Sequence, residues 1–312
     1  MSDARRVAVL KGGRSLERSV SLRSGAQVED GLQRAGHEVV GIDAGPTLVA
    51  DLRAAAPDAV FIALHGRDGE DGTVQGLLEA LGLPYTGSGP AACIRCTDKA
   101  LAKLLMREAE ISTPRFHTLR EASIRDLGAA DALGAIEADL GFPLVVKPAH
   151  GGSALGVKFA SDAAGLPGAM VGAFSYDGSI LLEQHVRGRD LAVSVLDGTA
   201  LPIVEAVPRE EEFYDYESRY EIGMTSFVCP AELPPELTER AQQLAVDAYR
   251  LLGCHGFARI DEMLDEQGDL WVLEANVVPG MTATSLLPQA ADAAGIAFEL
   301  LVERMLASAF TR

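Results

Sequence analysis

Two acidic side chains on a predicted β-hairpin near the C-terminal end of the chain have the types and spacing of a metal site. The segments FARIDEML and LWVLEAN have the composition of strands, and the turn-rich DEQGD joins them. We expect Asp261 to lie opposite Glu274, and Arg259 opposite Asn276, with all four side chains on one face because strand side chains alternate. Two carboxylates about 5 Å apart repel unless a cation lies between them. Carboxylate and amide oxygens, completed by substrate phosphates, describe a magnesium-nucleotide site.

The alternative is a solvated hairpin face on which these charges are incidental. The other face carries mostly apolar side chains suited to a core, namely Ala258, Ile260, Leu264, Trp271, Leu273 and Ala275. Glu262 also falls on that face, where an acid is unexpected. The turn VVPGMTATS after Asn276, with Pro279 and Gly280, favours a site over a solvated face.

The elements that must position this hairpin begin with an N-terminal parallel sheet. Three apolar segments, RVAVL, EVVGID and AVFIAL, alternate with helical segments, which predicts parallel strands with crossover helices. Ligands collect at the carboxyl ends of such strands. Those ends carry Gly12, Gly13, Glu17, His65 and Gly66. Paired glycines are common in turns and a lone histidine is often structural, but HGRDGEDG is too polar and glycine-rich to be core.

A lysine and a glycine-rich loop in the middle of the chain predict a phosphate site. In LGFPLVVKPAHGGSALGV, Lys147 ends an apolar strand and three glycines surround Ser153. Backbone N–H groups of such a loop can close over a phosphate beside a fixed positive charge. An ordinary hairpin turn is the alternative. The chain has no GxxxxGK[ST] run, which excludes a Walker-type site by pattern.

The remaining segments complete a nucleotide site in outline. A helix from Thr97, capped by Thr97 or Asp98, precedes a break at Pro114. LLEQHV could present backbone groups to an adenine edge and Glu183 to its amino group. The polar, aromatic segment 209–224 suits a mobile lid, with a solvated surface loop as the alternative. We expect helices over 236–252 and from 286 to 309.

Composition limits the class of protein. The 312 residues suggest two or three domains, and a hydrophobic fraction of 48% supplies a core. The net charge of −18 argues against nucleic-acid and membrane-surface binding, so an anionic substrate needs local basic residues or a metal. The sequence lacks a membrane-length apolar run and a signal peptide, which predicts a cytoplasmic protein. Cys93 and Cys96 form a CxxC without the second pair of a zinc site, so we interpret the four cysteines as structural or incidental thiols.

Taken together, these motifs resemble the D-alanine:D-alanine ligases of the ATP-grasp superfamily. The resemblance runs from Val7 to Leu306 and rests on GGRSLERSVSLRSG, HGRDGEDGTVQGLLEALGLPYTGSG, VVKPAHGGSALGV, FYDYESRY, ARIDEML and LEANVVPGMTATSLLP. Several long motifs in the right order are far more specific than any single glycine loop.

The resemblance implies an α/β fold, with α+β character in its ATP-binding part. An N-terminal parallel-sheet domain (1–96) would hold the first D-alanine. A two-part ATP-grasp fold would follow, with a central subdomain (97–180) and a C-terminal subdomain (181–312) that carries the lid loop and the magnesium site. ATP would lie between these two parts with two Mg²⁺ or Mn²⁺ ions. The family resemblance also suggests a homodimer.

The implied reaction joins two D-alanines for peptidoglycan synthesis. ATP phosphorylates the carboxylate of the first D-alanine, and the amine of the second attacks the acylphosphate and releases phosphate. Positioning and charge neutralisation carry such a phosphoryl transfer.

The resemblance also implies roles for individual residues. The nucleotide would contact Lys99, Lys147, Ser153, Glu183, Val186, Asp190 and Arg219. Within that set, Glu183 and the backbone near Val186 would meet the adenine, and Asp190 stands where the family commonly has a glutamate on the ribose. The metal ligands would be Asp261, Glu274 and Asn276.

The amino-acid substrates would be held by a second set. Glu17, at the ammonium, and His65 would hold the first D-alanine, and Ser153 and Tyr220 would join Glu17 in a network that ties the lid to the N-terminal domain. The oxyanion of the tetrahedral intermediate and the second substrate's carboxylate would be bound by Arg259, the Gly280 amide, Ser285 and Leu286.

Four positions depart from the family pattern: Ala154, Arg219, Glu262 and Val277. An arginine is not equivalent to a lysine at a phosphate, because its planar fork differs from a point charge. Two alternatives to the D-alanine reading stay open: a D-alanine:D-serine or D-alanine:D-lactate ligase, and a catalytically silent nucleotide-binding regulator. Tyr220 favours D-alanine, and the intact metal ligands with Arg259 count against the regulator.

Overall fold

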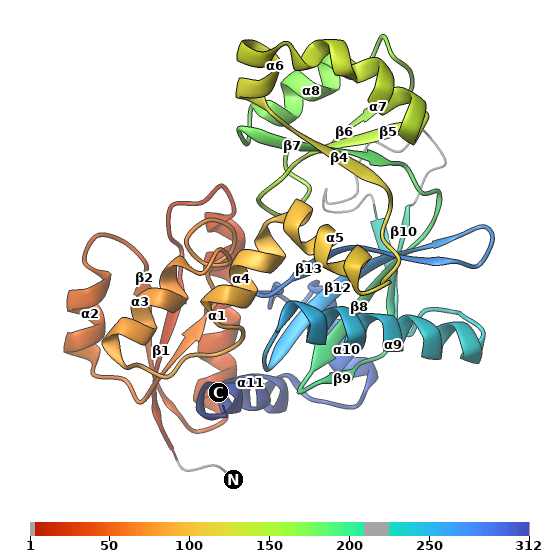
Figure 1. The fold of residues 1–312 in the computed structure, drawn as a ribbon. Coiled ribbons are helices and arrows are strands. Elements are labelled where there is room, and N and C mark those ends of the chain that lie inside the picture. Colours follow the sequence, from red (N-terminus) through yellow and green to blue (C-terminus); the bar gives the residue numbers. More distant parts are fainter. Residues whose placement is uncertain (1–3, 209–224, 312) are drawn as a thin grey trace.

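The computed structural model describes residues 4–208 and 225–311, which form three β-sheets covered by helices (Figure 1). Arg219 and Tyr220, predicted to act in the lid, lie outside the described residues. In the part of the chain that is described, every helix is too short or too polar to cross a lipid bilayer.

The N-terminal sheet is parallel, as predicted, with strand order β2-β1-β3. Its strands are β1 (Arg6–Lys11), β2 (Glu38–Asp43) and β3 (Ala59–Ile62). The helices of this region are α1 (Arg18–Arg34), α2 (Leu48–Ala55), α3 (Thr73–Leu81) and α4 (Pro90–Thr97). The consecutive residues Val7 to Leu10 are fully buried, as expected for a parallel strand that is covered on both faces.

A four-stranded antiparallel sheet forms the upper part of the molecule in Figure 1. Its order is β4-β7-β5-β6, from β4 (Phe116–Arg120), β7 (Ser179–Gln184), β5 (Leu144–Pro148) and β6 (Lys158–Ala160). Helices α6 (Glu121–Leu127), α7 (Leu133–Leu140) and α8 (Leu166–Phe174) and the short η1 (Ala129–Ala132) accompany it. Their apolar side chains close a separate core with the sheet, which includes Ile136, Leu144 and Leu182.

A six-stranded sheet carries the predicted hairpin. Its path runs β11-β10-β8-β12-β13, with β9 paired to β8. The bounds are β8 (Gly188–Leu196), β9 (Thr199–Ala200), β10 (Val204–Pro208), β11 (Thr225–Val228), β12 (Phe257–Asp265) and β13 (Leu270–Asn276). Helix α9 (Pro235–Leu252) packs against β8, β12 and β13.

The C-terminal segment is two helices, which corrects the single helical stretch predicted for 286–309. Helix α10 (Leu286–Ala293) ends before Gly295, whose φ of +75° breaks the helical path. Helix α11 (Phe298–Ala307) then packs against α1 and is followed by η3 (Ser308–Phe310).

Helix α5 (Lys99–Glu108) connects the N-terminal region to the four-stranded sheet. Asp98 caps it by accepting a hydrogen bond from the Leu101 amide at 3.0 Å, so of the two predicted caps the structure uses Asp98. The predicted domain boundaries remain a prediction, and β7, which pairs with β4 and β5, runs through the one drawn at residue 180.

The hairpin register is as predicted up to one point. Asp261 pairs with Glu274 and Arg259 with Asn276, but Glu262 pairs with Val272, which leaves Leu273 as an extra residue on β13. This bulge reverses the alternation of faces beyond it. Ala258, Ile260, Leu264 and Ala275 are buried in the core as predicted. The prediction was wrong for Trp271 and Leu273, because Leu270 and Val272 take the core positions instead.

Candidate functional site

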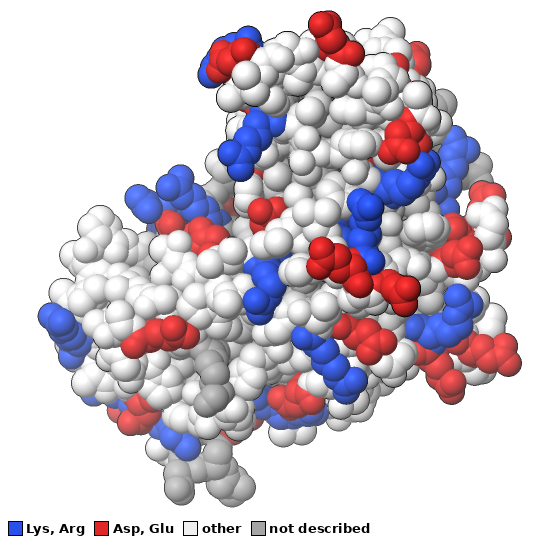
Figure 2. Space-filling view, viewed as in Figure 1, with Lys and Arg blue, Asp and Glu red and all other residues white. Residues whose placement is uncertain are grey.

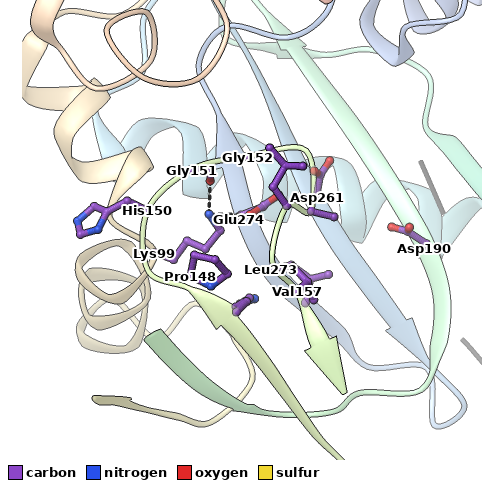
Figure 3. A pocket seen from close by; sticks show the side chains of 13 residues that line it. Lys99, Pro148, His150, Gly151, Gly152, Val157, Asp190, Asp261, Leu273 and Glu274 are labelled. Atoms are coloured by element: carbon purple, nitrogen blue, oxygen red, sulfur yellow. Dashed lines mark hydrogen bonds and ion pairs between the residues drawn. The ribbon is translucent and has the colours of Figure 1, made fainter. Parts of the chain in front are cut away.

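A pocket lies where the four-stranded sheet faces the hairpin (Figure 3). The first turn of α5, the end of β5 with the loop that follows it, one residue of β8 and the two strands of the hairpin line it. Lys99, Lys147, Asp190, Asp261 and Glu274, all predicted site residues, line it together. Leu273 lines it as well, because the bulge brings this side chain to the same side as Glu274.

The two facing carboxylates are each met by a cation of the chain itself. Arg259 donates two hydrogen bonds to Asp261, from Nε to Oδ1 at 2.7 Å and from one terminal nitrogen to Oδ2 at 2.8 Å. Lys99 Nζ lies 3.5 Å from Glu274 Oε2. Burial opposes ionisation of Glu274, but the charges of Lys99, Lys147 and Arg259 hold its pKa below the usual value. The repulsion that the sequence predicted is therefore relieved without a metal ion.

The predicted metal ligands still fit a hard divalent cation. Asp261, Glu274 and Asn276 offer carboxylate and amide oxygens from neighbouring strand positions. The Asn276 Oδ1 accepts a hydrogen bond from the Val278 amide at 3.0 Å, which fixes the orientation of its side chain. Among the described residues, groups of three or more His, Cys, Asp or Glu with metal-ligand geometry are absent. A cation here would thus depend on Asn276 and on oxygens of a bound ligand.

The residues predicted to bind adenine and phosphate, Glu183 and Lys147, also meet in an ion pair. Lys147 Nζ donates to Glu183 Oε1 at 2.7 Å, deep between β5 and β7. A second lysine, Lys103, lies 2.6 Å from Glu183 Oε2. Although burial opposes it, the charges of Lys103 and Lys147 keep the pKa of Glu183 lowered, so this carboxylate is ionised.

Sequence reasoning missed Lys103. The signal was its spacing of four residues from Lys99, which places both on one face of α5. That face is otherwise apolar, with Ala102 and Met106. A lysine on an apolar helix face indicates a buried partner, which is Glu183 here.

The loop between β5 and β6 turns over the first turn of α5. Lys99 donates a hydrogen bond to the Gly151 carbonyl, drawn as a dashed line in Figure 3. Ser153 and Ala154 have φ angles of +51° and +54°, so this loop bends through two non-glycine residues in the left-handed region. The bend aims the Ser153 hydroxyl at Glu17, to which it donates a hydrogen bond.

A second polar group surrounds Glu17 at the carboxyl ends of β1 and β3. His65 is buried, with Nε2 3.0 Å from Ser24 Oγ and Nδ1 3.4 Å from Glu70 Oε1. Burial and the nearby charge of Glu70 raise the pKa of Glu17, while Ser153 and His65 act against that shift. Glu70 was not predicted individually, although it lies within HGRDGEDG.

The loop after Asn276 joins this group from the C-terminal side. The Met281 amide donates to Ser24 Oγ at 3.1 Å, so one hydroxyl of α1 connects His65 to the loop. The Thr282 amide donates to Ser285 Oγ at 3.0 Å. A Cβ on Gly280 would lie 2.7 Å from that same oxygen, so the absence of a side chain lets the turn close.

The other predicted residues lie around these groups. Asp190 lines the pocket from β8, apart from Glu274 and Asp261 in Figure 3. Val186 is half-buried in the connection between β7 and β8, and Leu286 is the first residue of α10.

Acidic and basic side chains intermix on the face of the described molecule shown in Figure 2. Four cations (Lys99, Lys103, Lys147 and Arg259) and three carboxylates (Glu183, Asp261 and Glu274) form ion pairs at and behind the pocket. The lining itself holds two of these cations, Lys99 and Lys147, with the carboxylates of Asp190, Asp261 and Glu274.

Comparison with known proteins gives a consistent result. A family model described as "D-ala D-ala ligase C-terminus" matches residues 105–307, and one described as "D-ala D-ala ligase N-terminus" matches residues 45–88. The D-alanine–D-alanine ligase of Syntrophotalea carbinolica is 44% identical over 99% of this chain and 97% of its own length.

Solved structures agree with the sequence relatives. A D-alanine–D-alanine ligase from Bacillus anthracis is similar with a TM-score of 0.86 at 36% identity, covering 99% of this chain and 98% of that one. A D-alanine–D-alanine ligase from Bacillus anthracis in complex with ATP gives a TM-score of 0.84 at 34% identity with the same coverage. With a matched family model over most of its length and a full-length relative above 40% identity, the chain belongs to the D-alanine–D-alanine ligase family.

Proposed function

We propose that this protein joins two D-alanine molecules in an ATP-dependent reaction, which gives D-alanyl-D-alanine, ADP and phosphate. The observation that carries the proposal is the pocket in which Lys99 and Lys147 are ion-paired with carboxylates of the chain beside Asp261, next to the Glu17 and His65 group. Two relatives at 44% and 36% identity, which match over nearly their full length, carry this activity in their names. They do not favour the D-serine, D-lactate or regulator alternatives.

The charge pairs supply a way to bind a triphosphate. Lys99 and Lys147 lie on carboxylates of the chain, Glu274 at 3.5 Å and Glu183 at 2.7 Å. Both ammonium groups can turn from these carboxylates to phosphate oxygens, which are equally good acceptors with more negative charge. The loop with Gly151 and Ser153 would close over the same phosphates.

The metal ligands complete this exchange. When bound at Asp261, Glu274 and Asn276, a divalent cation would neutralise phosphate charge during phosphoryl transfer. Arg259, which donates two hydrogen bonds to Asp261, would then be available for the oxyanion that forms when the second amine attacks.

The amino-acid residues of the site would orient the two D-alanines. Glu17, held by the Ser153 hydroxyl, would bind the ammonium of the first D-alanine beside His65. The carboxylate of that D-alanine would then point toward the pocket proposed to bind the phosphates. The Gly280 amide, Ser285 and Leu286, on the loop and helix after β13, would receive the second D-alanine. Attack of its amine on the acylphosphate carbonyl expels phosphate and forms the peptide bond.

The test is to incubate the protein with ATP, Mg²⁺ and, in turn, D-alanine, D-serine with D-alanine, D-lactate with D-alanine, and L-alanine. We expect ADP release with D-alanine alone and a product of the mass of D-alanyl-D-alanine, in equal amounts. Absence of ADP release with D-alanine, or a mixed product formed in preference to the D-alanine dipeptide, would contradict the proposal.

A further inference from the structure

Lys103 is a fully buried lysine behind the proposed nucleotide site, and it does not line the pocket itself. Its ammonium contacts Glu183 Oε2 at 2.6 Å and donates to Thr113 Oγ1 at 2.5 Å. It also lies 5.7 Å from the centre of the Phe116 ring. Burial lowers the pKa of Lys103 to about 8, although the charge of Glu183 acts in the opposite direction. So costly a placement of a cation requires a compensating role.

Thr113 connects Lys103 to the hairpin by hydrogen bonds. Its hydroxyl donates to the Val272 carbonyl at 2.8 Å, so its one proton is used there and its oxygen must accept from Lys103. The Val272 amide in turn donates to the Ser112 carbonyl at 2.8 Å. Residues 112–113 are thus fixed on the edge of β13, two positions before Glu274. Through these contacts, Lys103 on α5 is connected to the end of β7 that carries Glu183 and to β13, the strand that carries the proposed metal ligand Glu274.

The charges around Glu183 indicate what Lys103 contributes to the proposed nucleotide site. Glu183 is shared by two lysines, one on each carboxylate oxygen. Lys147 faces the pocket, and Lys103 lies behind it. If Lys147 leaves Glu183 for a phosphate, the buried carboxylate keeps Lys103 as its partner. Without Lys103, the same movement would leave an unpaired buried charge, which is strongly unfavourable.

We propose that Lys103 is a positioning residue for the nucleotide: it holds Glu183 ionised and in place through the contacts to Glu183 and Thr113, so that Lys147 is free to bind phosphate. The inference rests on the proposed function, because it takes Glu183 and Lys147 as nucleotide residues. It adds a residue that touches neither ATP nor amino acid and acts through Glu183.

The test measures nucleotide binding and turnover separately. Binding of a non-hydrolysable ATP analogue with Mg²⁺ is measured by calorimetry in the full-length protein without D-alanine, for wild type and for Lys103→Met. We expect the dissociation constant to rise at least about tenfold, since a charged hydrogen bond contributes about 1.5–3 kcal/mol. In turnover assays KM for ATP should rise while KM for D-alanine changes less than about twofold. Arg107→Met, on the exposed side of the same helix, is the matched control and should bind as wild type.

A double-mutant cycle separates positioning from a general loss of structure. Lys103→Met and Glu183→Gln are combined, which removes both buried charges. If Lys103 acts through Glu183, then Lys103→Met weakens analogue binding strongly in wild type and little in the Glu183→Gln background. In the double variant the buried Glu183 carboxylate is gone, so folding no longer needs the Lys103 ammonium as its partner. The same variant keeps the test valid should Lys103→Met alone fail to fold.

Thr113→Val and Thr113→Ser extend the cycle. Loss of the hydroxyl should weaken analogue binding, and serine should restore it. Unchanged analogue binding in folded Lys103→Met, or an equal loss with and without Glu183, would overturn the inference. A wild-type protein that binds the analogue but does not ligate D-alanine would contradict the proposed function and leave the Lys103 inference standing.

Discussion

Glu262 is an acid at a position where the sheet needs an apolar side chain. It is 0% exposed and pairs with Leu191 on β8 and Val272 on β13, both fully buried. Within the described residues, neither carboxylate oxygen has a hydrogen-bond partner. Burial, and then the charge of Asp261, raise the pKa of Glu262 well above 4.5. The fold therefore favours the neutral, protonated form of Glu262, next to the proposed metal ligand Asp261.

This burial predicts a pH-dependent loss of stability. The unfolded chain releases the Glu262 proton as the pH rises past 4.5, whereas the folded chain keeps it. The contribution of Glu262 to the free energy of unfolding is thus most favourable below pH 4.5. It falls by up to about 1.4 kcal/mol per pH unit until the pH reaches the raised pKa of the folded state. Glu262→Gln lacks this term, so its melting temperature relative to wild type should increase between pH 5 and pH 8. Glu266→Gln, exposed on the same hairpin, should show no such trend, and parallel pH profiles for all three proteins would contradict the prediction.

Glu274 makes a residue-scale prediction of the opposite kind. Glu274→Gln removes a proposed metal ligand and the partner of Lys99, while it keeps the shape of the side chain. We expect Mg²⁺-dependent ADP release to fall at least about a hundredfold, with the fold retained in circular dichroism. Glu266→Gln again serves as the control. Near-normal turnover in Glu274→Gln would remove the metal assignment.

At the scale of single elements, the loop between β5 and β6 depends on a glycine. Gly156 has a φ of +76°, and a Cβ there would lie 2.5 Å from Tyr176 Cδ2 and 2.9 Å from Pro148 Cγ. Backbone strain and side-chain clash thus coincide at the point where the loop returns to β6. The loop contributes Gly151 to the pocket and the Ser153 hydroxyl to Glu17, so a different path at Gly156 would alter both.

Gly156→Ala should therefore lower stability by about 1–3 kcal/mol and raise KM for ATP. Gly168→Ala is the matched control, because Gly168 lies in α8 with open space around its Cα, and alanine there should be neutral or slightly stabilising. The measurements are chemical denaturation and steady-state kinetics on both variants. A Gly156→Ala protein as stable and as active as wild type would show that the loop tolerates a different path.

The elements also show where sequence patterns succeed and where they fail. The strands around Val7–Leu10, the cap at Asp98 and the pairing of Asp261 with Glu274 followed from short-range rules, because each depends on a few neighbouring residues. Leu273 did not follow from pattern, since a bulge leaves no mark in an apolar run. Lys103 was missed because its partner Glu183 lies on another element, and spacing within one helix does not identify such a partner.

At the scale of the whole molecule, the N-terminal and C-terminal regions share their cores. One apolar cluster contains both Leu10 of β1 and Ile260 of β12, and another contains Val9 of β1 and Leu301 of α11. The four-stranded sheet has a core of its own. The residues proposed to bind the two amino acids, which come from both ends of the chain, are therefore fixed relative to each other. Helix α5 and the 112–113 segment connect them to the sheet that would hold the nucleotide. The homodimer implied by the family resemblance stays a prediction, which light scattering would test.

Ser24 connects the N-terminal and C-terminal regions by hydrogen bonds, in addition to their shared apolar cores. Its hydroxyl contacts His65 Nε2 and accepts from the Met281 amide, so Ser24→Ala leaves a buried amide without its acceptor. We expect a loss of about 1–3 kcal/mol in unfolding free energy and a rise in KM for D-alanine with little change in KM for ATP. Ser19→Ala, exposed on the same helix, is the control. Equal effects on both substrates would indicate a general loosening of the fold rather than a local one.

Because of the bulge at Leu273, the number of residues in β13 decides which side chains reach the candidate site. With one residue more on β13 than on the facing part of β12, both Leu273 and Glu274 turn toward the pocket while Val272 and Ala275 stay in the core. A gain or loss of one residue here would exchange the two faces beyond the bulge, whatever the side chains are. We therefore expect an insertion or deletion of one residue here to disturb more positions than a single substitution does, and anyone who transplants the hairpin into another scaffold must carry Leu273 along with Asp261 and Glu274.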